Sequence, residues 1–301
     1  RDLKTSRAVR EAANALGADV LHGHGAKGGA FVRLAGRDLR RSGRHVAVFY
    51  TPHGGSLHYG PASPQGLVYL AVEKFLARYT DGLIFESGFI GDVYDRRVGG
   101  AGVPRRVIPN ALQPHDFTPH QPNAGAAEFL FIGELRQLKG VDVLLEALSR
   151  IAADRPVRAV IAGAGPDASK YHSQAQELNL DGLVSFPGAV PAQTAFASGR
   201  VLVVPSRAES MPYIVLEAAA ASMPIIATNV GGIPEIVNGT DTPLISPGDS
   251  EALYEAMVGF LDDPEAAKRR AVRLKAAVAD RFTVARAAES VLAFYAERLG
   301  R

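Results

Sequence analysis

Residues Val201–Glu235 read V-L-V-V-P-S-R-A-E-S-M-P-Y-I-V-L-E-A-A-A-A-S-M-P-I-I-A-T-N-V-G-G-I-P-E. The apolar run Val201–Pro205 predicts a buried strand, and Glu209 follows it in a short loop. Ser210 is predicted to be the N-cap of a helix, with Pro212 in its first turn. This strand, loop and helix form the kind of unit from which helix-covered parallel sheets are built.

The same stretch carries groups that can hold a phosphate and a sugar. Free N–H groups in the first turn of the predicted helix form an anion site. Glu217, two turns into the helix, can accept hydrogen bonds from a pair of ribose hydroxyls. A second strand, Pro224–Thr228, leads into Gly231 and Gly232, where the backbone can approach a ligand closely. We therefore predict a phosphate cradle flanked by two carboxylates.

Outward from this stretch, short apolar runs alternate with amphipathic segments along the chain. The alternation predicts an α/β protein with parallel sheets covered by helices. The other predicted strands are Ala18–His22, Val46–Thr51, Gly82–Glu86, Arg106–Pro109, Glu128–Gly133, Val157–Gly163, Leu183–Pro187 and Thr242–Ile245. The predicted helices include Ser6–Leu16, Val141–Ala152, Ala168–Asn179, Ser250–Leu261, one capped by Asp263 and one from Thr283 to Leu299.

A proline-rich segment between Pro109 and Ala127 has little periodicity and predicts a linker. We expect it to separate two doubly wound lobes, at residues 1–118 and 119–281, with a last helix at 282–301 that packs back toward the first lobe. The first lobe starts on a helix and has only four predicted strands. We therefore expect its opening βαβ portion to be missing.

The composition excludes several classes of function. The chain has 301 residues, enough for two domains with cores of their own. It has no cysteine, which excludes disulfides, cysteine-based zinc sites and thiol chemistry. With 33 basic and 31 acidic residues, no global field would recruit nucleic acid. No apolar stretch approaches the ~20 residues of a membrane-spanning helix.

A second group of site residues lies in Phe129–Gly140, F-L-F-I-G-E-L-R-Q-L-K-G. The predicted strand ends at Gly133, and Arg136 and Lys139 follow in the loop. Open parallel sheets bind ligands at the edge where their strands end, so two cations are expected there. Such cations stabilise the negative charge that develops on a departing diphosphate.

The order of these motifs resembles the retaining nucleotide-sugar glycosyltransferases of family 4. Glu209 and Glu217 match the Glu-x7-Glu motif of that family. Further matching segments are Gly133–Gly140, Ile161–Pro166, Phe186–Gly188 and Gly231–Glu235, with weaker ones at Asp19–His24, Tyr50–Gly54 and Val107–Asn110. The resemblance implies a GT-B type fold, two Rossmann-like lobes that face each other across a cleft.

The resemblance also implies roles for individual residues. Lys139 and Arg136 would bind the diphosphate, Glu209 would lie beside the donor sugar, and Glu217 would bind the ribose. His53 of the first lobe would contact the transferred sugar. The implied donor-binding positions are Gly133, Gly165, Phe186, Val190, Ser210, Met211, Pro212, Tyr213, Ile214 and Glu217. No metal ion and no tightly bound cofactor is implied.

Two positions depart from the family pattern. Glu134 stands where a basic residue often follows the glycine, so that role passes to Arg136. The segment Ser210–Tyr213 replaces the common Gly-Phe-Gly, which weakens the expectation of backbone contacts to the donor sugar. These departures leave open a non-catalytic protein that binds nucleotide sugars.

The resemblance implies transfer of a sugar, with retention, from a nucleotide diphosphate sugar to a hydroxyl of a glycan or lipid-linked acceptor. A UDP-sugar is favoured, and surface polysaccharide or glycolipid synthesis in the cytoplasm is the expected setting. Two carboxylates alone would also fit a glycoside hydrolase. Gly163-x-Gly165-x-x-Ala168 fits the dinucleotide fingerprint superficially, which keeps an NAD-dependent oxidoreductase as a distant alternative.

Two further patterns have more than one interpretation. His22 and His24 have metal-ligand spacing, but two imidazoles without a carboxylate nearby make a poor site. The basic run Arg33, Arg37, Arg40, Arg41 and Arg44 is either a solvated face or a surface attracted to anionic lipid headgroups on the inner face of a membrane.

Overall fold

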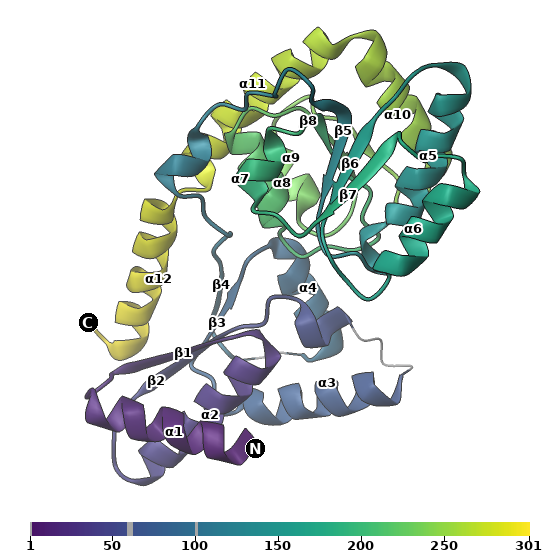
Figure 1. Cartoon of the computed structure of the whole chain (residues 1–301). Coiled ribbons are helices and arrows are strands. Elements are labelled where there is room, and N and C mark those ends of the chain that lie inside the picture. Colours follow the sequence, from purple (N-terminus) through teal and green to yellow (C-terminus); the bar gives the residue numbers. More distant parts are fainter. Residues whose placement is uncertain (1, 59–62, 100–101) are drawn as a thin grey trace. The chain divides into compact units, whose positions relative to one another are not determined.

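The computed structural model describes residues 2–58, 63–99 and 102–301 (Figure 1). The chain divides into two compact units. Unit 1 comprises Arg1–Asn110 and Ala285–Arg301, and unit 2 comprises Ala111–Val284. The boundary thus follows Asn110, within the segment predicted to be a linker, and the last helix belongs to unit 1.

In the described part of unit 1, a parallel four-stranded sheet has the order β1-β2-β3-β4. Its strands are β1 (Val20–His24), β2 (Ala47–Thr51), β3 (Gly82–Phe85) and β4 (Arg105–Val107). Its helices are α1 (Asp2–Ala15), α2 (Gly25–Arg41), the 3₁₀ helix η1 (Gly55–His58), α3 (Pro64–Ala77), α4 (Gly88–Arg97) and α12 (Val284–Leu299).

Helices cover both faces of this sheet because its two central strands, β2 and β3, are buried along their whole length. Phe49 of β2 packs in one buried cluster with Phe294 of α12. The next residue, Tyr50, points to the opposite face and packs with Leu70 of α3 and Ile90 of α4. The sequence around β2 therefore dictates a buried central strand.

Part of the basic run on α2 is used inside unit 1, and the prediction that it forms an exposed basic surface is wrong for Arg33. Arg33 is fully buried, and its Nη1 lies 2.9 Å from Glu73 Oε2. The Tyr50 hydroxyl donates to the other oxygen of Glu73 at 2.9 Å. A buried arginine requires a charged partner, which Glu73 provides for Arg33. Arg40, which is partly buried, donates to the Val46 carbonyl.

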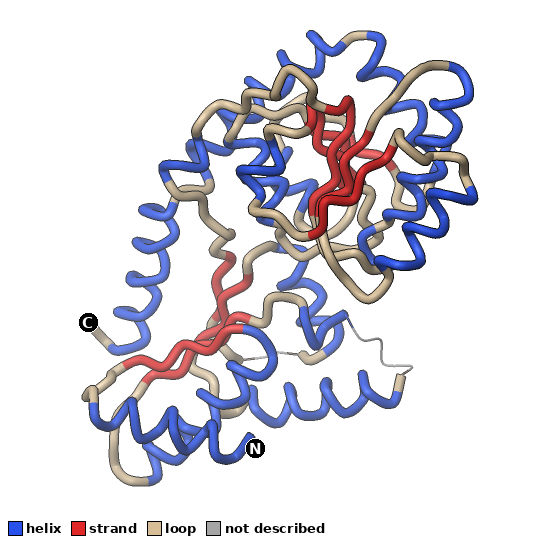
Figure 2. Tube along the Cα trace, in the orientation of Figure 1, coloured by secondary structure: helices blue, strands red, loops and turns tan. Residues whose placement is uncertain are grey.

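Unit 2 contains a sheet with the order β10-β9-β8-β5-β6-β7, in which all neighbouring strands are parallel. Figure 2 shows the strands in red with the helices around them in blue. Its strands are β5 (Ala127–Ile132), β6 (Ala159–Ala162), β7 (Val184–Gly188), β8 (Gly199–Val204), β9 (Ile225–Thr228) and β10 (Leu244–Ile245). Its helices are η2 (Pro114–Phe117), η3 (Gln137–Lys139), α5 (Val141–Asp154), α6 (Ala168–Glu177), α7 (Ala192–Phe196), α8 (Tyr213–Ala220), α9 (Ile233–Val237), α10 (Ser250–Asp262) and α11 (Pro264–Arg281).

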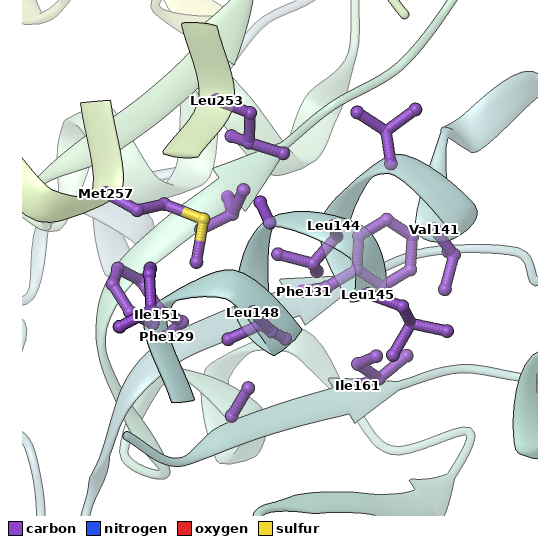
Figure 3. Close-up of a cluster of buried hydrophobic side chains, with 14 of the residues drawn as sticks. Phe129, Phe131, Val141, Leu144, Leu145, Leu148, Ile151, Ile161, Leu253 and Met257 are labelled. Atoms are coloured by element: carbon purple, nitrogen blue, oxygen red, sulfur yellow. The ribbon is translucent and has the colours of Figure 1, made fainter. Parts of the chain in front are cut away.

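A hydrophobic cluster lies on each face of this sheet. On one face, Phe129 and Ile161 pack with Leu144 of α5 and Met257 of α10 (Figure 3). On the other face, buried side chains of β8 pack against α8, α9 and α11. The two faces give the three-layer architecture of a doubly wound fold.

The α/β fold class and the predicted strands are confirmed. Each strand lies at its predicted place, with ends that shift by a residue or two. The predicted start of α8 is wrong, because the N-cap is Pro212 and not Ser210. A proline disfavours helical backbone at the residue before it, so the helix cannot begin at Met211. The Ser210 carbonyl instead accepts a hydrogen bond from the Gly232 N–H at 2.6 Å.

Candidate active site

The loops that follow β5, β6, β8 and β9 meet at one edge of the unit 2 sheet, since parallel strands end at the same edge. Two of them touch at Gly140, which has a φ of 70°. A Cβ at Gly140 would lie 2.0 Å from the Pro205 carbonyl oxygen. A Cβ at Gly231, which has a φ of 59°, would lie 1.9 Å from the Glu209 carbonyl oxygen. Only glycine permits this packing of the loops.

This loop packing joins two of the predicted catalytic residues. Lys139 Nζ donates to Glu209 Oε1 at 2.7 Å. Ser206 Oγ donates to the same oxygen, also at 2.7 Å. Glu209 is 8% exposed and Lys139 is partly exposed, so the cation has a side open to a ligand while its partner carboxylate is fixed beneath. An ammonium held in this way can bind a diphosphate oxygen.

Arg136 lies in the same loop but makes a different contact. Its guanidinium is 3.2 Å from the carboxylate of Glu134, and both side chains are about half exposed. The acidic residue that departs from the family pattern therefore pairs with the arginine predicted to replace it. A diphosphate would have to compete with Glu134 for Arg136.

Arg207 is a site residue that the sequence analysis missed. Its guanidinium donates to both oxygens of Asp142 at 2.7 Å and to the Gln137 carbonyl at 2.9 Å. Its backbone N–H donates to the Leu138 carbonyl at 2.8 Å. Arg207 thereby ties the loop after β8 to η3, which carries Lys139. The available signal was an arginine directly after Ser206 and an aspartate at the start of the helix after the basic loop.

The environment of Asp142 depends on this arginine. Burial alone would raise the pKa of Asp142, but the hydrogen bonds and charge of Arg207 outweigh it and hold that pKa below its usual value. Asp142 is therefore ionised near neutral pH, and the ion pair persists there.

Glu217 lines a pocket to which Lys139 and Glu209 do not contribute. The pocket has a volume of about 460 Å³ and is also lined by His115, Asp116, Gln193 and Phe196. Burial raises the pKa of Glu217, and the nearby charge of Asp116 raises it further. This pocket contains polar side chains around an acceptor carboxylate, a suitable environment for hydroxyl groups.

The remaining positions that the sequence predicts to bind the donor differ in exposure. Met211 is buried in the core, so only its backbone could touch a ligand, whereas Tyr213 is half exposed. Phe186 packs against His172, with the ring centroids 4.2 Å apart and the ring planes tilted by 32°. Val190 and Ile214 are partly buried against the α8 side of the core.

The glycines of the dinucleotide-like fingerprint have a packing role. A Cβ at Gly163 would lie 1.9 Å from the Gly133 carbonyl oxygen, and one at Gly165 would lie 2.4 Å from the Leu135 carbonyl oxygen. These glycines let the loop after β6 lie against the loop after β5. Their presence needs no dinucleotide to explain it.

Unit 1 has a histidine cluster where β1 and β2 end. His53 Nε2 and His24 Nδ1 are 2.9 Å apart and share a hydrogen bond. His22 bonds to the Tyr295 hydroxyl at 2.5 Å and to Thr51 Oγ1 at 2.9 Å. Burial, with smaller effects of the neighbouring histidines, lowers the pKa of His22 to about 3.

Burial also lowers the pKa values of His24 and His53, so all three rings are neutral near pH 7. Within residues 2–58, 63–99 and 102–301, no group of three or more His, Asp or Glu side chains is arranged to hold a metal ion. In the same residues, no helix is long and apolar enough to span a bilayer.

Comparisons with known proteins agree with this arrangement. The family described as "Glycosyl transferases group 1" matches residues 126–263, and the family described as "Glycosyl transferase 4-like domain" matches residues 1–111. Glycogen synthase of Mycobacterium tuberculosis is 33% identical over 208 residues, which are 67% of this chain and 50% of that protein. The chain thus spans about half the length of this relative.

Two further similarities extend over nearly the whole chain. The structure of sucrose-phosphate synthase from Thermosynechococcus elongatus has a TM-score of 0.83 at 25% identity and covers 98% of this chain and 77% of that one. The structure of Anabaena HepE in complex with UDP-glucose has a TM-score of 0.83 at 21% identity, with 98% and 81% covered, which shows the shared fold.

A relative from Bacillus subtilis decides the family. The putative glycosyltransferase EpsD of strain 168 is 30% identical over 312 residues, and the match covers 98% of this chain and 81% of that protein. This match removes the oxidoreductase interpretation. With the doubly wound sheets and the ion pair at the edge of the unit 2 sheet, it shows that the chain belongs to the glycosyltransferases with the GT-B fold of two Rossmann-like lobes.

Proposed function

We propose that the chain transfers a sugar, with retention of configuration, from a nucleotide diphosphate sugar to a hydroxyl of a glycan or lipid-linked acceptor. The observation that carries this proposal is the Lys139–Glu209 pair at 2.7 Å, where the strands of unit 2 end. A partly exposed cation over a fixed carboxylate suits a ligand with a negative diphosphate and a neutral sugar. A UDP-sugar is favoured because UDP-glucose is bound by HepE, which has the same fold.

In the proposed reaction, the bond between the anomeric carbon and the diphosphate oxygen breaks while the acceptor oxygen bonds to that carbon. Lys139 and Arg136 stabilise the negative charge that develops on the diphosphate. The N–H groups at the start of α8 add to this stabilisation. The acceptor attacks from the side of the leaving group, and the departing phosphate takes its proton. We propose this reaction without a metal ion.

Calorimetric titration of the chain with UDP, GDP, ADP and NAD tests the donor site. We expect saturable binding of one nucleoside diphosphate. Lys139→Ala should weaken it about tenfold to a hundredfold, because one charge-assisted contact contributes about 1.4–2.8 kcal/mol. Glu217→Ala should weaken it too. Lys268→Ala is the matched control, since Lys268 is an exposed lysine of α11 paired with Glu265.

Release of UDP from UDP-glucose separates an enzyme from a protein that only binds nucleotide sugars. We expect slow release without acceptor, and slower release in Lys139→Ala. Binding without any release would favour the non-catalytic alternative. Binding of NAD alone, or unchanged affinity in both site variants, would overturn the assignment of the site.

We also propose that unit 1 contacts the surface of a membrane that carries anionic lipid. The surface consists of exposed apolar residues of α3, Leu67, Val68, Val72 and Phe75, which are 43–62% exposed. The charged residues exposed on this helix and at its end are the cations Lys74 and Arg78, because Glu73 is buried beneath Arg33. Apolar side chains flanked by cations suit an anionic lipid surface.

Co-sedimentation with vesicles tests this contact. The chain should bind vesicles that contain an anionic phospholipid more strongly than purely zwitterionic ones. The double variant Val72→Ser/Phe75→Ser should lose most of this binding. Leu292→Ser is the control, since Leu292 is an apolar residue of α12 that is even more exposed, at 63% against 44% for Val72 and 43% for Phe75. Equal binding by all three proteins would remove the proposal.

A further inference from the structure

Glu86 is a buried carboxylate that the proposed transfer reaction does not yet use. It follows directly after β3 and is only 2% exposed. Within the described part of the chain, neither of its carboxylate oxygens has a hydrogen-bond partner. An unpaired buried carboxylate is costly, and burial raises the pKa of Glu86 accordingly. Buried polar groups without a partner are few in native structures, so this carboxylate requires an explanation.

The residue beside it is His53, which the family resemblance places in the active site. His53 Nδ1 lies 4.0 Å from Glu86 Oε1, and the His53 side chain is 39% exposed above the buried carboxylate. The backbone of His53 has a φ of 51°. This conformation costs a non-glycine residue energy, and such residues cluster at functional sites. The 4.0 Å separation is longer than a hydrogen bond, and catalytic hydrogen bonds are often long before the substrate complex forms.

The other nitrogen of His53 is already engaged. Its Nε2 shares the 2.9 Å hydrogen bond with His24 Nδ1, and both rings are neutral near pH 7 because burial lowers their pKa values. A neutral imidazole has one N–H and one lone pair. In a bonded pair of neutral rings, one must donate and the other must accept. The group that faces the free nitrogen of one ring therefore sets the tautomer of both.

We propose that Glu86 is a positioning residue, whose carboxylate accepts the Nδ1–H of His53 and thereby fixes the tautomers of the His53–His24 pair. With Nδ1–H on His53, its Nε2 accepts from Nδ1–H of His24. The Nε2 lone pair of His24 then remains. His24 is exposed, and in the described residues no protein group bonds to this nitrogen.

The consequence for binding rests on the proposed function. A lone pair on His24 Nε2 accepts a hydrogen bond from a hydroxyl group, as a sugar acceptor would supply, whereas the opposite tautomer would present an N–H there. Through the two tautomers, Glu86 thus determines that His24 Nε2 accepts a hydrogen bond from a hydroxyl group. The acidic residue does this without touching the ligand, since its carboxylate is buried.

The direct test is nitrogen NMR of the full chain labelled at histidine, because protonated and unprotonated ring nitrogens have well-separated shifts. Histidine variants at 24 and 53 assign the signals. We expect Nδ1–H on both rings, although free histidine favours Nε2–H. Glu86→Met removes the acceptor but keeps the side-chain volume, and it should return His53 to Nε2–H. Glu86→Gln should retain Nδ1–H, because its amide oxygen still accepts.

Asp92→Asn is the matched control, since Asp92 is an exposed carboxylate of α4 in the same unit. It should leave both tautomers unchanged. Finding Nε2–H on His53 in the unaltered chain, or Nδ1–H in Glu86→Met, would overturn the inference. Donor binding and UDP release are read separately. If the unaltered chain shows the expected Nδ1–H tautomers but neither binds a donor nor releases UDP, the proposed function is contradicted and the inference about Glu86 is not.

Discussion

Replacing Arg207 by alanine should destabilise unit 2 and loosen the loop that carries Lys139. The change removes three hydrogen bonds, two to Asp142 at 2.7 Å and one to the Gln137 carbonyl at 2.9 Å. Charge-assisted bonds contribute about 1.5–3 kcal/mol each when buried. Here the side chains of Arg207 and Asp142 are 31% and 21% exposed. Because water screens a pair this exposed, we expect a total loss of about 2 kcal/mol.

Differential scanning calorimetry measures this effect. A loss of about 2 kcal/mol should lower the Tm of a unit of this size by about 4–8 °C. Because Arg207 holds the pKa of Asp142 low, the stabilisation is present at neutral pH and is lost as the pH falls through that pKa. The difference in Tm between Arg207→Ala and the unaltered chain should therefore shrink in acid.

The same variant should weaken binding of the nucleoside diphosphate about tenfold, or about 1.4 kcal/mol, because Lys139 loses its fixed position. Arg155→Ala is the control, since Arg155 makes an exposed ion pair with Asp262 in the same unit. Its Tm and affinity should stay close to those of the unaltered chain. An unchanged Tm in Arg207→Ala would refute the reasoning about the ion pair, and an unchanged affinity would refute its link to the site.

Three other outcomes are expected. Gly231→Ala should cost about 2 kcal/mol more than Gly239→Ala in urea unfolding, since overpacking adds to backbone strain. Both glycines have positive φ, but only at Gly231 would a Cβ clash with the Glu209 carbonyl oxygen. An equal loss of unfolding free energy in the two variants would show that this clash has no effect. Because the pKa of His22 is lowered to about 3 in the folded chain, its ring takes up a proton at a higher pH in the unfolded chain than in the folded one. Lowering the pH from 7 to 5 should therefore reduce the free energy of unfolding of the unaltered chain by about 2 kcal/mol more than that of His22→Gln. An equal reduction in both proteins would refute this. Asp263→Ala should cost about 1 kcal/mol by removing an N-cap, which thermal unfolding would detect. The cap in question is that of α11, where the Asp263 side chain accepts from the Ala266 N–H.

The sequence by itself determined where the strands lie along the chain, the fold class and the family. Periodicity and chain order are local properties, and the short apolar run at Val201–Pro205 between turn signals favours a buried strand. The glycines at 140 and 231 were recognisable, but the reason for them is not local. Each is required because a carbonyl from a distant loop occupies the place of its Cβ.

Only the tertiary structure decided the partners of charged residues. Lys139 and Glu209 are 70 positions apart, and Arg207 and Asp142 are 65 apart. Their pairing depends on which strands lie side by side. The run of arginines on α2 had two interpretations, a solvated face or a lipid-binding surface. Arg33 belongs to neither, because it is buried against Glu73. Glu86 gave no signal in the sequence, because an acidic residue after a strand acquires meaning only from its burial beside His53. Spacing along a chain fixes which residues share an element, whereas a charge takes its role from neighbours that only folding brings within a few ångströms.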